Sequence, residues 1–331
     1  MGYKICVIRG DGIGNDVIDA GLKLLSHVNL DFDYSYAEAG YDYYLKNGTS
    51  IPQETIEACR NADATLFGAV SSPPDIPDYK SAIVTLRKEL DLFVNVRPIK
   101  SLPVEISRPN IDIVMMRENT EGMYKGIERE ENGVAIAERH ISKKASRRLA
   151  EFTYKYAREN SRKRVTVVHK ANVLRKTCGL FRRTVLSVSE KFPDIETEEV
   201  IVDAMAMRLI KEPERFDVVV TTNLFGDILS DEASQLVGGL GIAPSGNIGE
   251  KRGLFEPVHG SAPKYAGKDV ANPTATFLSA TMMLDFLGEK REGDRIRNSI
   301  FKTFAEGKRT KDLGGNLGTL AFTEAVINNL E

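Results

Sequence analysis

The chain has 331 residues, of which 42% are apolar and 28% charged, enough for about two domains with buried cores. Its formal net charge of −2 supplies no basic surface for nucleic acid or an acidic membrane. Three separated cysteines without metal-ligand spacing, no signal peptide and no apolar run of transmembrane length predict a cytoplasmic protein with no membrane partner.

The first predicted elements are a strand that contains Cys6 and a helix, joined by Gly10-Asp11-Gly12-Ile13-Gly14. This segment lies where a dinucleotide-binding fingerprint would lie, but it lacks the G-x-G-x-x-G spacing. We therefore interpret it as a tight strand-to-helix turn beside a ligand rather than as a Rossmann fingerprint.

Short apolar strands alternate with amphipathic helices along the chain, which is typical of an α/β fold with a largely parallel sheet. Four strand ends lead directly into polar segments, within residues 64–74, 111–122, 165–172 and 217–234. Ligands of open α/β sheets bind at the carboxyl ends of strands, so these segments predict an active site. Pro98 and the glycine-rich residues 238–249 are candidate crossings between domains, and residues 128–137 indicate an exposed hairpin.

Cationic side chains stand near several of these strand ends. Guanidinium groups pair bidentately with carboxylates, so Arg87, Arg97 and Arg117 would together suit a di- or tricarboxylate. Each of them alone is better explained as a surface residue or a structural ion pair. Lys170 follows an apolar strand and could transfer a proton, with Tyr124 as its partner acid.

The segment from Asp217 to Gly241 is the most informative part of the chain. Residues 217–222 form a β-branched run that predicts a strand covered on both faces, and a helix follows. Asp227 and Asp231 share one face of that helix, where like charges repel by about a few tenths of a kcal/mol. A cation between them would make a hard-oxygen site suited to Mg²⁺ or Mn²⁺. Two solvated surface acids are the alternative.

The last third of the chain contains a loop at residues 254–267 followed by Ala271-Asn272-Pro273. Its small residues allow close backbone approach, while His259 and Asn272 offer donors and acceptors on a surface the size of an adenine. A plain turn-rich loop explains the same residues equally well.

In their order along the chain, these motifs resemble those of the metal-dependent β-decarboxylating dehydrogenases, the family of isocitrate, homoisocitrate and 3-isopropylmalate dehydrogenases. The similarity covers essentially the whole chain, and so many motifs in order are highly specific. They are G-D-G-I-G at Gly10, L-R-K-E-L-D-L at Leu86, N-V-R-P at Asn95, R-E-N-T-E-G at Arg117, H-K-A-N-V at His169, V-D-A-M-A-M at Val202, F-G-D-I-L-S-D at Phe225, E-P-V-H-G-S-A-P at Glu256 and D-L-G-G at Asp312.

The resemblance implies an α/β, isocitrate/isopropylmalate dehydrogenase-like two-domain fold, which is not a Rossmann fold. Residues 1–98 and 247–331 would form a large, discontinuous cofactor-binding domain. Residues 99–246 would form a small domain with the dimer interface and the metal-binding aspartates. A homodimer with shared active sites is implied, and a tetramer stays open.

The resemblance also assigns roles. The substrate carboxylates would be bound by Arg87, Arg97 and Arg117, and the metal by Asp227, Asp231 and, from the partner subunit, Asp203. Lys170, also from the partner, would stand on the base side. The metal would acidify the substrate hydroxyl, and C2 would pass hydride to a nicotinamide near Asn172. After loss of CO₂, Tyr124 would protonate C3.

The cofactor that the resemblance indicates is NADP. NAD-dependent relatives carry Asp after the Ala-Pro of the His259 loop, whereas this chain has Lys264 and Tyr265, the pair typical of NADP-dependent isocitrate dehydrogenases. A cation and a phenol favour the 2′-phosphate that a carboxylate would repel, although surface lysines without selectivity are the alternative. The other implied cofactor contacts are Asn172, Glu256, His259, Gly260, Ser261, Ala262 and Asn272.

Substrate choice depends on three residues before Arg87. Ser81 resembles the serine that meets the distal carboxylate in isocitrate dehydrogenases, whereas apolar Ile83 and Val84 are similar to archaeal homoisocitrate and 3-isopropylmalate enzymes. We predict isocitrate, with overlapping homoisocitrate activity, and keep 3-isopropylmalate as the alternative. A non-catalytic regulatory subunit is the alternative of another class, and the presence of every catalytic and metal-binding residue argues against it.

Overall fold

The computed structural model describes residues 2–76 and 79–330, which divide into two compact units. Unit 1 comprises Met1–Leu92, Leu102–Pro109 and Val237–Glu331, and unit 2 comprises Phe93–Ser101 and Asn110–Leu236. The chain therefore leaves unit 1 after Leu92, returns to it for Leu102–Pro109 and returns again at Val237. The sequence-based prediction places the domain boundaries at residues 98 and 247. Each unit is described by itself.

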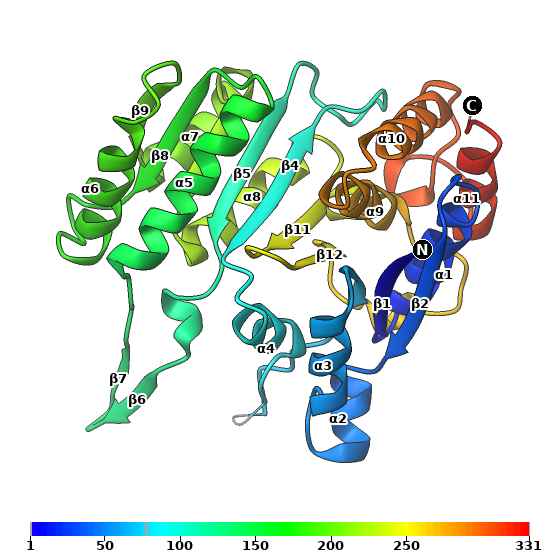
Figure 1. The fold of residues 1–331 in the computed structure, drawn as a ribbon, viewed down its shortest axis with the longest axis horizontal. Coiled ribbons are helices and arrows are strands. Elements are labelled where there is room, and N and C mark those ends of the chain that lie inside the picture. The colour runs from blue at the N-terminus through cyan, green and yellow to red at the C-terminus, as the bar shows by residue number, and fades with distance from the viewer. Residues whose placement is uncertain (1, 77–78, 331) are drawn as a thin grey trace. The chain divides into compact units, whose positions relative to one another are not determined.

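Unit 1 contains a mostly parallel set of strands with helices on both faces (Figure 1). Its strands stand in the order β2-β1-β3-β12-β11, with only the β11–β12 pair antiparallel among the described strands. The strands are β1 (Tyr3–Gly10), β2 (Phe32–Ala37), β3 (Ala64–Ala69), β11 (Pro244–Ile248) and β12 (Gly253–Pro257). The helices are α1 (Gly14–Leu25), α2 (Tyr41–Asn47), α3 (Gln53–Asn61), α4 (Ala82–Glu89), α9 (Thr274–Phe286), α10 (Lys290–Ala305) and α11 (Thr319–Ile327).

One hydrophobic cluster of unit 1 joins α3 and α4 to the sheet. Cys6 and Phe67 of the strands pack with Cys59 of α3 and Leu86 of α4, and all four side chains are at most 2% exposed. The prediction that Cys6 belongs to a core is thus confirmed. Burying such side chains stabilises the fold by about 1.5–3 kcal/mol each, and here it fixes the start of α4, where Ser81 lies.

Unit 2 is also α/β, with strands in the order β4-β5-β10-β8-β9. The strands are β4 (Val94–Lys100), β5 (Asp112–Glu118), β8 (Arg164–His169), β9 (Glu196–Ile201) and β10 (Val218–Thr221), and β6 (Glu128–Glu131) and β7 (Val134–Ala137) form a separate hairpin. The helices are α5 (Lys143–Glu159), α6 (Thr177–Ser189), α7 (Val202–Lys211) and α8 (Asn223–Gln235). Every pair except β4–β5 and the hairpin is parallel among the described strands of this unit.

The strand β10 is central to unit 2, and all its residues are buried. It pairs in parallel with β5 and β8, while α5 and α8 both pack against it. This arrangement explains why residues 217–222 are β-branched and apolar, since the strand has no solvent-facing side. The predicted strand and the following helix are confirmed, and so is the largely parallel α/β sheet.

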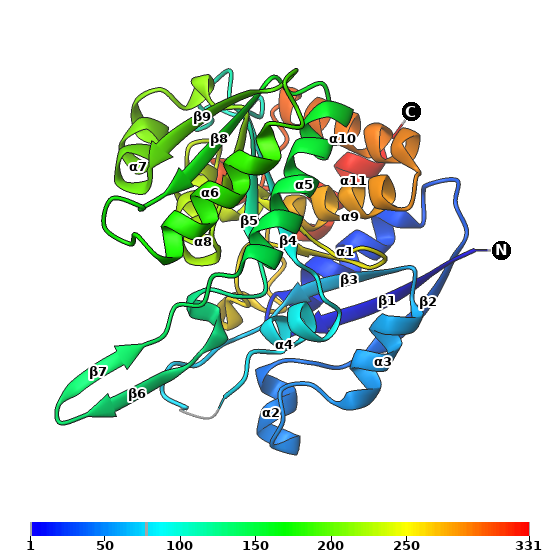
Figure 2. The same cartoon turned by 60° about the vertical axis from the view of Figure 1, so that its left-hand side comes forward.

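The β6–β7 hairpin projects from unit 2, away from the strands of that unit's sheet (Figure 2). Its residues are almost all exposed, so the predicted exposed hairpin is confirmed. Within residues 2–76 and 79–330, no helix is long and apolar enough to cross a membrane.

Candidate active site

Arg97 and Arg117 project onto the same face of the unit 2 sheet. The strands β4 and β5 are antiparallel, with Asn95 opposite Arg117 and Arg97 opposite Met115. Opposed residues point to one face, and residues two apart share a face, so both guanidinium groups emerge where α8 packs. A Cβ at Gly226 would lie 2.7 Å from Arg117 Cγ, so glycine at that position lets α8 approach closely.

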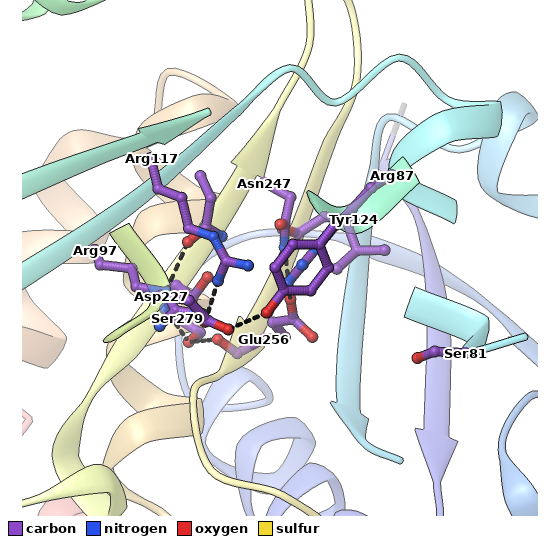
Figure 3. A network of polar contacts seen from close by, with 12 residues as sticks. Ser81, Arg87, Arg97, Arg117, Tyr124, Asp227, Asn247, Glu256 and Ser279 are labelled. Atoms are coloured by element: carbon purple, nitrogen blue, oxygen red, sulfur yellow. Dashed lines mark hydrogen bonds and ion pairs between the residues drawn. The ribbon is translucent and has the colours of Figure 1, made fainter. Parts of the chain in front are cut away.

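The two acids on α8 contact these arginines, and Figure 3 shows the contacts of Asp227. Arg117, whose side chain is 1% exposed, forms an ion pair with Asp227 and donates to Asn223 Oδ1 at 3.0 and 2.8 Å. Arg97 Nη2 lies 3.4 Å from Asp227 Oδ1, and Arg97 Nη1 lies 3.0 Å from Asp231 Oδ1. One guanidinium group therefore spans both carboxylates and offsets the like-charge repulsion expected from the sequence.

Tyr124 joins the same group of residues from a short turn, Met123–Lys125. Its hydroxyl donates to Asp227 Oδ2, and the guanidinium carbon of Arg117 lies 5.0 Å from the centre of its ring (Figure 3). The phenol is thus held by a carboxylate and by a cation over its face. We call Arg97, Arg117, Tyr124, Asp227 and Asp231 the arginine–aspartate cluster.

The donor set of this cluster suits a hard divalent cation. The side chains of Asp227 and Asp231 are 31% and 47% exposed, so both carboxylates can be reached. The pKa of Asp231 is raised, mainly because the carboxyl is partly buried. The negative charge of Asp227 raises it further, whereas Arg97 lowers it. A bound cation would stabilise the ionised carboxylate of Asp231. Among the described residues, no three His, Cys, Asp or Glu are grouped to hold a metal ion, so further ligands would have to come from elsewhere.

Lys170 and Asp203 form a second group in unit 2. The strands β8 and β9 are parallel with His169 opposite Ile201, so the residues that follow the two strand ends lie side by side. Lys170 Nζ donates to Asp203 Oδ1 at 2.7 Å, and this bond is the first cause that lowers the pKa of Asp203. Within the described part of the chain, no ion pair joins these two residues to the arginine–aspartate cluster.

Arg87, the third predicted carboxylate-binding arginine, lies in unit 1. Its Nη2 is 3.0 Å from Glu256 Oε1, which also accepts from Asn247 Nδ2 at 2.7 Å (Figure 3). Both charged side chains are at most 10% exposed, and Arg87 Nε is buried without a hydrogen-bond partner. A residue predicted to bind substrate is therefore paired with Glu256, a residue predicted to bind cofactor.

The predicted substrate-selecting residues occupy the first turn of α4, on unit 1. Ser81 is the residue before the helix, its Oγ accepts from Ser72 Oγ at 3.3 Å, and its carbonyl accepts from Thr85 N. Ile83 is partly buried against the hydrophobic cluster of unit 1, and Val84 is half-buried beside it. The turn thus offers a hydroxyl and apolar surface together.

The predicted cofactor loop of unit 1 packs against the glycine-rich turn. Ile13 N donates to Ser261 O at 2.8 Å, and Ser71 Oγ lies 2.6 Å from Ser261 Oγ. Gly12 has a φ of +54°, and a Cβ there would lie 2.1 Å from Ser261 O, so only glycine fits. Beyond this contact, Lys264 Nζ lies 4.7 Å from the ring centre of Tyr265, and both side chains are exposed.

Other predicted cofactor residues of unit 1 have structural roles. Asn272 Nδ2 donates to Asp312 Oδ2 at 2.9 Å, and Asn272 Oδ1 accepts from Thr274 N at 3.0 Å, so this side chain holds the start of α9. His259 Nδ1 lies 3.0 Å from Gly260 O, while Nε2 is buried without a partner and burial lowers the pKa of the ring. Asn172 is exposed in unit 2, on the turn after Lys170.

A cavity of about 560 Å³ lies in unit 1 beside the glycine-rich turn. Asp11 organises it, because its buried carboxylate accepts from Tyr41 N at 2.8 Å, Asp42 N at 2.9 Å and Ser71 N at 2.8 Å. Asp11 lies in the glycine-rich motif at residues 10–14, but the sequence alone indicated no role for it. The lining residues are Asp11, Gly12, Asn15, Tyr41, Asp42, Ser71, Ser72, Pro73, Pro263 and Ala266.

An α/β fold with carboxylate, guanidinium and phenol groups gathered at strand ends defines an enzyme of small anionic substrates. Residues 4–329 match the family model described as isocitrate/isopropylmalate dehydrogenase. The chain therefore belongs to the isocitrate/isopropylmalate dehydrogenase family of oxidative, β-decarboxylating dehydrogenases. Members of this family use NAD(P) and a divalent metal, are typically dimeric and bind small carboxylate substrates.

Individual relatives bear out this assignment and differ in the substrate that their names state. The chain is 52% identical to an isocitrate/homoisocitrate dehydrogenase of Thermus thermophilus, over 100% of the chain and 99% of the relative. It is 50% identical to a 3-isopropylmalate dehydrogenase of Methanothermobacter thermautotrophicus, over 99% of the chain and 98% of the relative. The crystal structure of isocitrate dehydrogenase from Methylococcus capsulatus matches with a TM-score of 0.96 at 40% identity, covering 99% of both chains.

Proposed function

We propose that this chain catalyses the NADP-dependent oxidative decarboxylation of isocitrate to 2-oxoglutarate and CO₂, with homoisocitrate as a second substrate and Mg²⁺ or Mn²⁺ as metal. The observation that carries the proposal is the arginine–aspartate cluster, in which two buried guanidinium groups and a phenol meet two accessible carboxylates. The stated names of the Thermus and Methylococcus relatives support the substrate.

The residues of the cluster have complementary tasks in this reaction. Arg97 and Arg117 bind carboxylate groups of the substrate, for which buried guanidinium forks are well suited. A divalent ion held by Asp227 and Asp231 supplies Lewis-acid polarisation of the substrate hydroxyl. Tyr124, whose hydroxyl already donates a proton toward a carboxylate, delivers a proton to C3 after decarboxylation.

Lys170 and Asp203 complete the active site of a second subunit in this proposal. The two residues lie 2.7 Å apart and would enter the partner's site together, Asp203 as a metal ligand and Lys170 on the base side. Unit 2 also exposes apolar side chains on α7 and α8, with Met207 59% and Ile228 60% exposed, which suits burial against another copy.

The cofactor choice depends on the loop after Ala262. Lys264 and Tyr265 are both exposed at its tip and would face the 2′-phosphate of NADP. The nearby cavity, lined in part by Pro263 and Ala266, offers room for part of a nucleotide. The segments before and after this loop would bring the remaining predicted contacts to the cofactor, which are Glu256, His259, Gly260, Ser261, Ala262 and Asn272.

A second candidate substrate is 3-isopropylmalate, which the apolar pair Ile83 and Val84 favours. Both side chains are half-buried on the first turn of α4, so they present apolar surface that would suit a branched alkyl group. The Methanothermobacter relative carries this activity in its name.

The proposal is tested by initial rates of NADPH or NADH formation with isocitrate, homoisocitrate and 3-isopropylmalate, each with Mg²⁺ or Mn²⁺. We expect the highest kcat/KM for isocitrate with NADP, a measurable rate for homoisocitrate, and full loss of turnover with a chelator that added metal restores. A preference for 3-isopropylmalate would make the second candidate correct. If no combination of substrate and cofactor were turned over, and a cooperative thermal transition showed that the protein is folded, the chain would be a non-catalytic regulatory subunit.

A further inference from the structure

His169 closes a hydrogen bond across Lys170. It is the last residue of β8, its side chain is buried, and its Nδ1 accepts the backbone N–H of Ala171 at 3.1 Å. The imidazole ring therefore connects the residues before and after Lys170, the residue proposed to act on the base side of proton transfer. Because Nδ1 is an acceptor, the proton of the neutral ring is on Nε2.

The other ring nitrogen, Nε2, contacts Glu199, which in turn accepts hydrogen bonds from Arg182 of α6. Residues 167 and 199 are opposite each other in the parallel β8–β9 pair, so His169 and Glu199 share one face of the sheet. Nε2 lies 3.2 Å from Glu199 Oε2, and Arg182 of α6 donates to Glu199 Oε1 at 2.7 Å and also to Oε2. These contacts fix the tautomer that leaves Nδ1 free to accept from Ala171.

The backbone of Lys170 is fixed on its other side as well. Its carbonyl oxygen accepts from Val173 N at 3.1 Å and from Leu174 N at 2.8 Å. These bonds and the bond to Ala171 form one tight turn, from which the side chain of Lys170 reaches Asp203. Because the Lys170 side chain is long, a small rotation of this turn would displace the ammonium group further than it displaces the backbone.

We propose that His169 is a positioning residue for proton transfer, which acts by fixing the turn at Lys170 and does not touch the substrate. This inference depends on the proposed role of Lys170. A misplacement of about 1 Å at a reacting group costs about a hundredfold in rate, so the effect should appear in kcat. KM for isocitrate should change little, because the arginines that bind the carboxylates are elsewhere.

Two conservative variants separate this role from general packing. His169→Asn places Oδ1 near the position of Nδ1 and keeps an acceptor for Ala171 N–H, as in a local Asx turn. His169→Gln places its amide near Nε2, keeps a donor for Glu199 and loses the acceptor at Nδ1. We expect kcat within about threefold of the natural chain for the asparagine variant and about ten- to a hundredfold lower for the glutamine variant.

Hydrogen exchange gives a readout that does not depend on turnover. Peptides that contain Ala171 should keep slow amide exchange in His169→Asn and exchange faster in His169→Gln. Glu198→Gln is the control, because Glu198 is next to Glu199 on β9 but bonds to Thr166 and Arg215 instead of to His169. It should alter neither exchange at Ala171 nor kcat.

The pH profile of the natural chain is a measurement that needs no stable variant. Glu199 and Arg182 are the charged groups that face the ring from β9 and α6, and burial is the main cause that lowers the pKa of His169, so the ring stays neutral near pH 7. Protonation turns Nδ1 into a donor and removes the bond to Ala171. The protection factor of the Ala171 amide, the ratio of the exchange rate in an unstructured peptide to the observed rate at the same pH, should therefore fall in acid, together with a fall in kcat that His169→Asn lacks.

Equal kcat and equal exchange in the asparagine and glutamine variants would overturn the inference. Lys170→Met separates this failure from failure of the proposed function. If Lys170→Met is inactive while the two His169 variants are alike, the role of Lys170 stands and that of His169 is wrong. If Lys170→Met keeps its turnover, both are wrong.

Discussion

At the scale of single residues, the catalytic proposal depends most on Asp227, which contacts two arginines and Tyr124. Asp227→Asn keeps the shape and an acceptor for these donors, but it removes one of the three carboxylate charges proposed to attract a divalent ion. We expect kcat to fall by about a hundredfold or more, with weaker Mg²⁺ binding by calorimetry.

Asp194→Asn is the control for this substitution, since it removes the same charge from an exposed acid that pairs with Arg158. It should leave both kcat and Mg²⁺ binding unchanged. Full metal-dependent turnover in Asp227→Asn would show that the metal assignment is wrong.

Two histidines with lowered pKa values predict how stability depends on pH. Burial lowers the pKa of His169 and of His259 below the ordinary value of 6.5. Below about pH 6.5 the unfolded chain therefore binds more protons than the folded chain, and stability rises with pH through this window. We expect the midpoint of thermal unfolding to fall as the pH is lowered from 7 toward 5, and to fall less steeply in His169→Asn. A midpoint that rises over this range would contradict the prediction.

At the scale of elements, the loop after β12 is expected to select the cofactor. Lys264→Asp with Tyr265→Ile replaces a cation and a phenol with a carboxylate, which repels the 2′-phosphate of NADP. We expect the ratio of kcat/KM for NADP to that for NAD to fall by about tenfold or more, which is about 1.4 kcal/mol. Lys268→Asp makes the same charge change four residues away on an exposed position and should leave the ratio nearly unchanged. An unchanged ratio in the double variant would remove the basis for NADP.

The elements differ in how far the sequence could predict them. The strand β10 and the start of α8 were predictable because a β-branched run and a helical spacing of two acids are local patterns. The ion pairs of Arg97 with Asp227 and Asp231 could not be predicted, because they depend on the register of β4 against β5. The sequence also could not predict that Asp11 accepts from three backbone amides up to 60 residues away.

The same difference applies to the candidate site. Motif order was enough to make Asp227 and Tyr124 candidates, and the structure places both in one network of hydrogen bonds and ion pairs. His169 belongs to the H-K-A-N-V motif, but the sequence indicated no role for it. Its hydrogen bond with the backbone N–H of Ala171 forms only because the turn brings these two residues together. Residues whose function is to hold other residues therefore need a structure.

At the scale of the whole molecule, the remaining question is whether one active site takes residues from two subunits. Lys170→Met and Asp227→Asn should each be inactive as homodimers, since each removes a required group from both sites. Refolded together, a mixed dimer would contain one site with both groups intact and one site with both groups lost. Random mixing of equal amounts should therefore restore about a quarter of the natural activity, because half the dimers are mixed and half their sites are complete.

Sites built from a single chain would behave differently, because every site in a mixed dimer would then lack one group. Mixing Lys170→Met with Lys170→Arg is the matched control, as both changes fall on the same residue and no combination rebuilds a site with its lysine. Size-exclusion chromatography of each sample checks that dimers form, so that an inactive mixture cannot be ascribed to dissociated subunits. Restored activity in the first mixture alone would establish that Lys170 acts across the interface, and an inactive dimeric mixture would place the whole site within one chain.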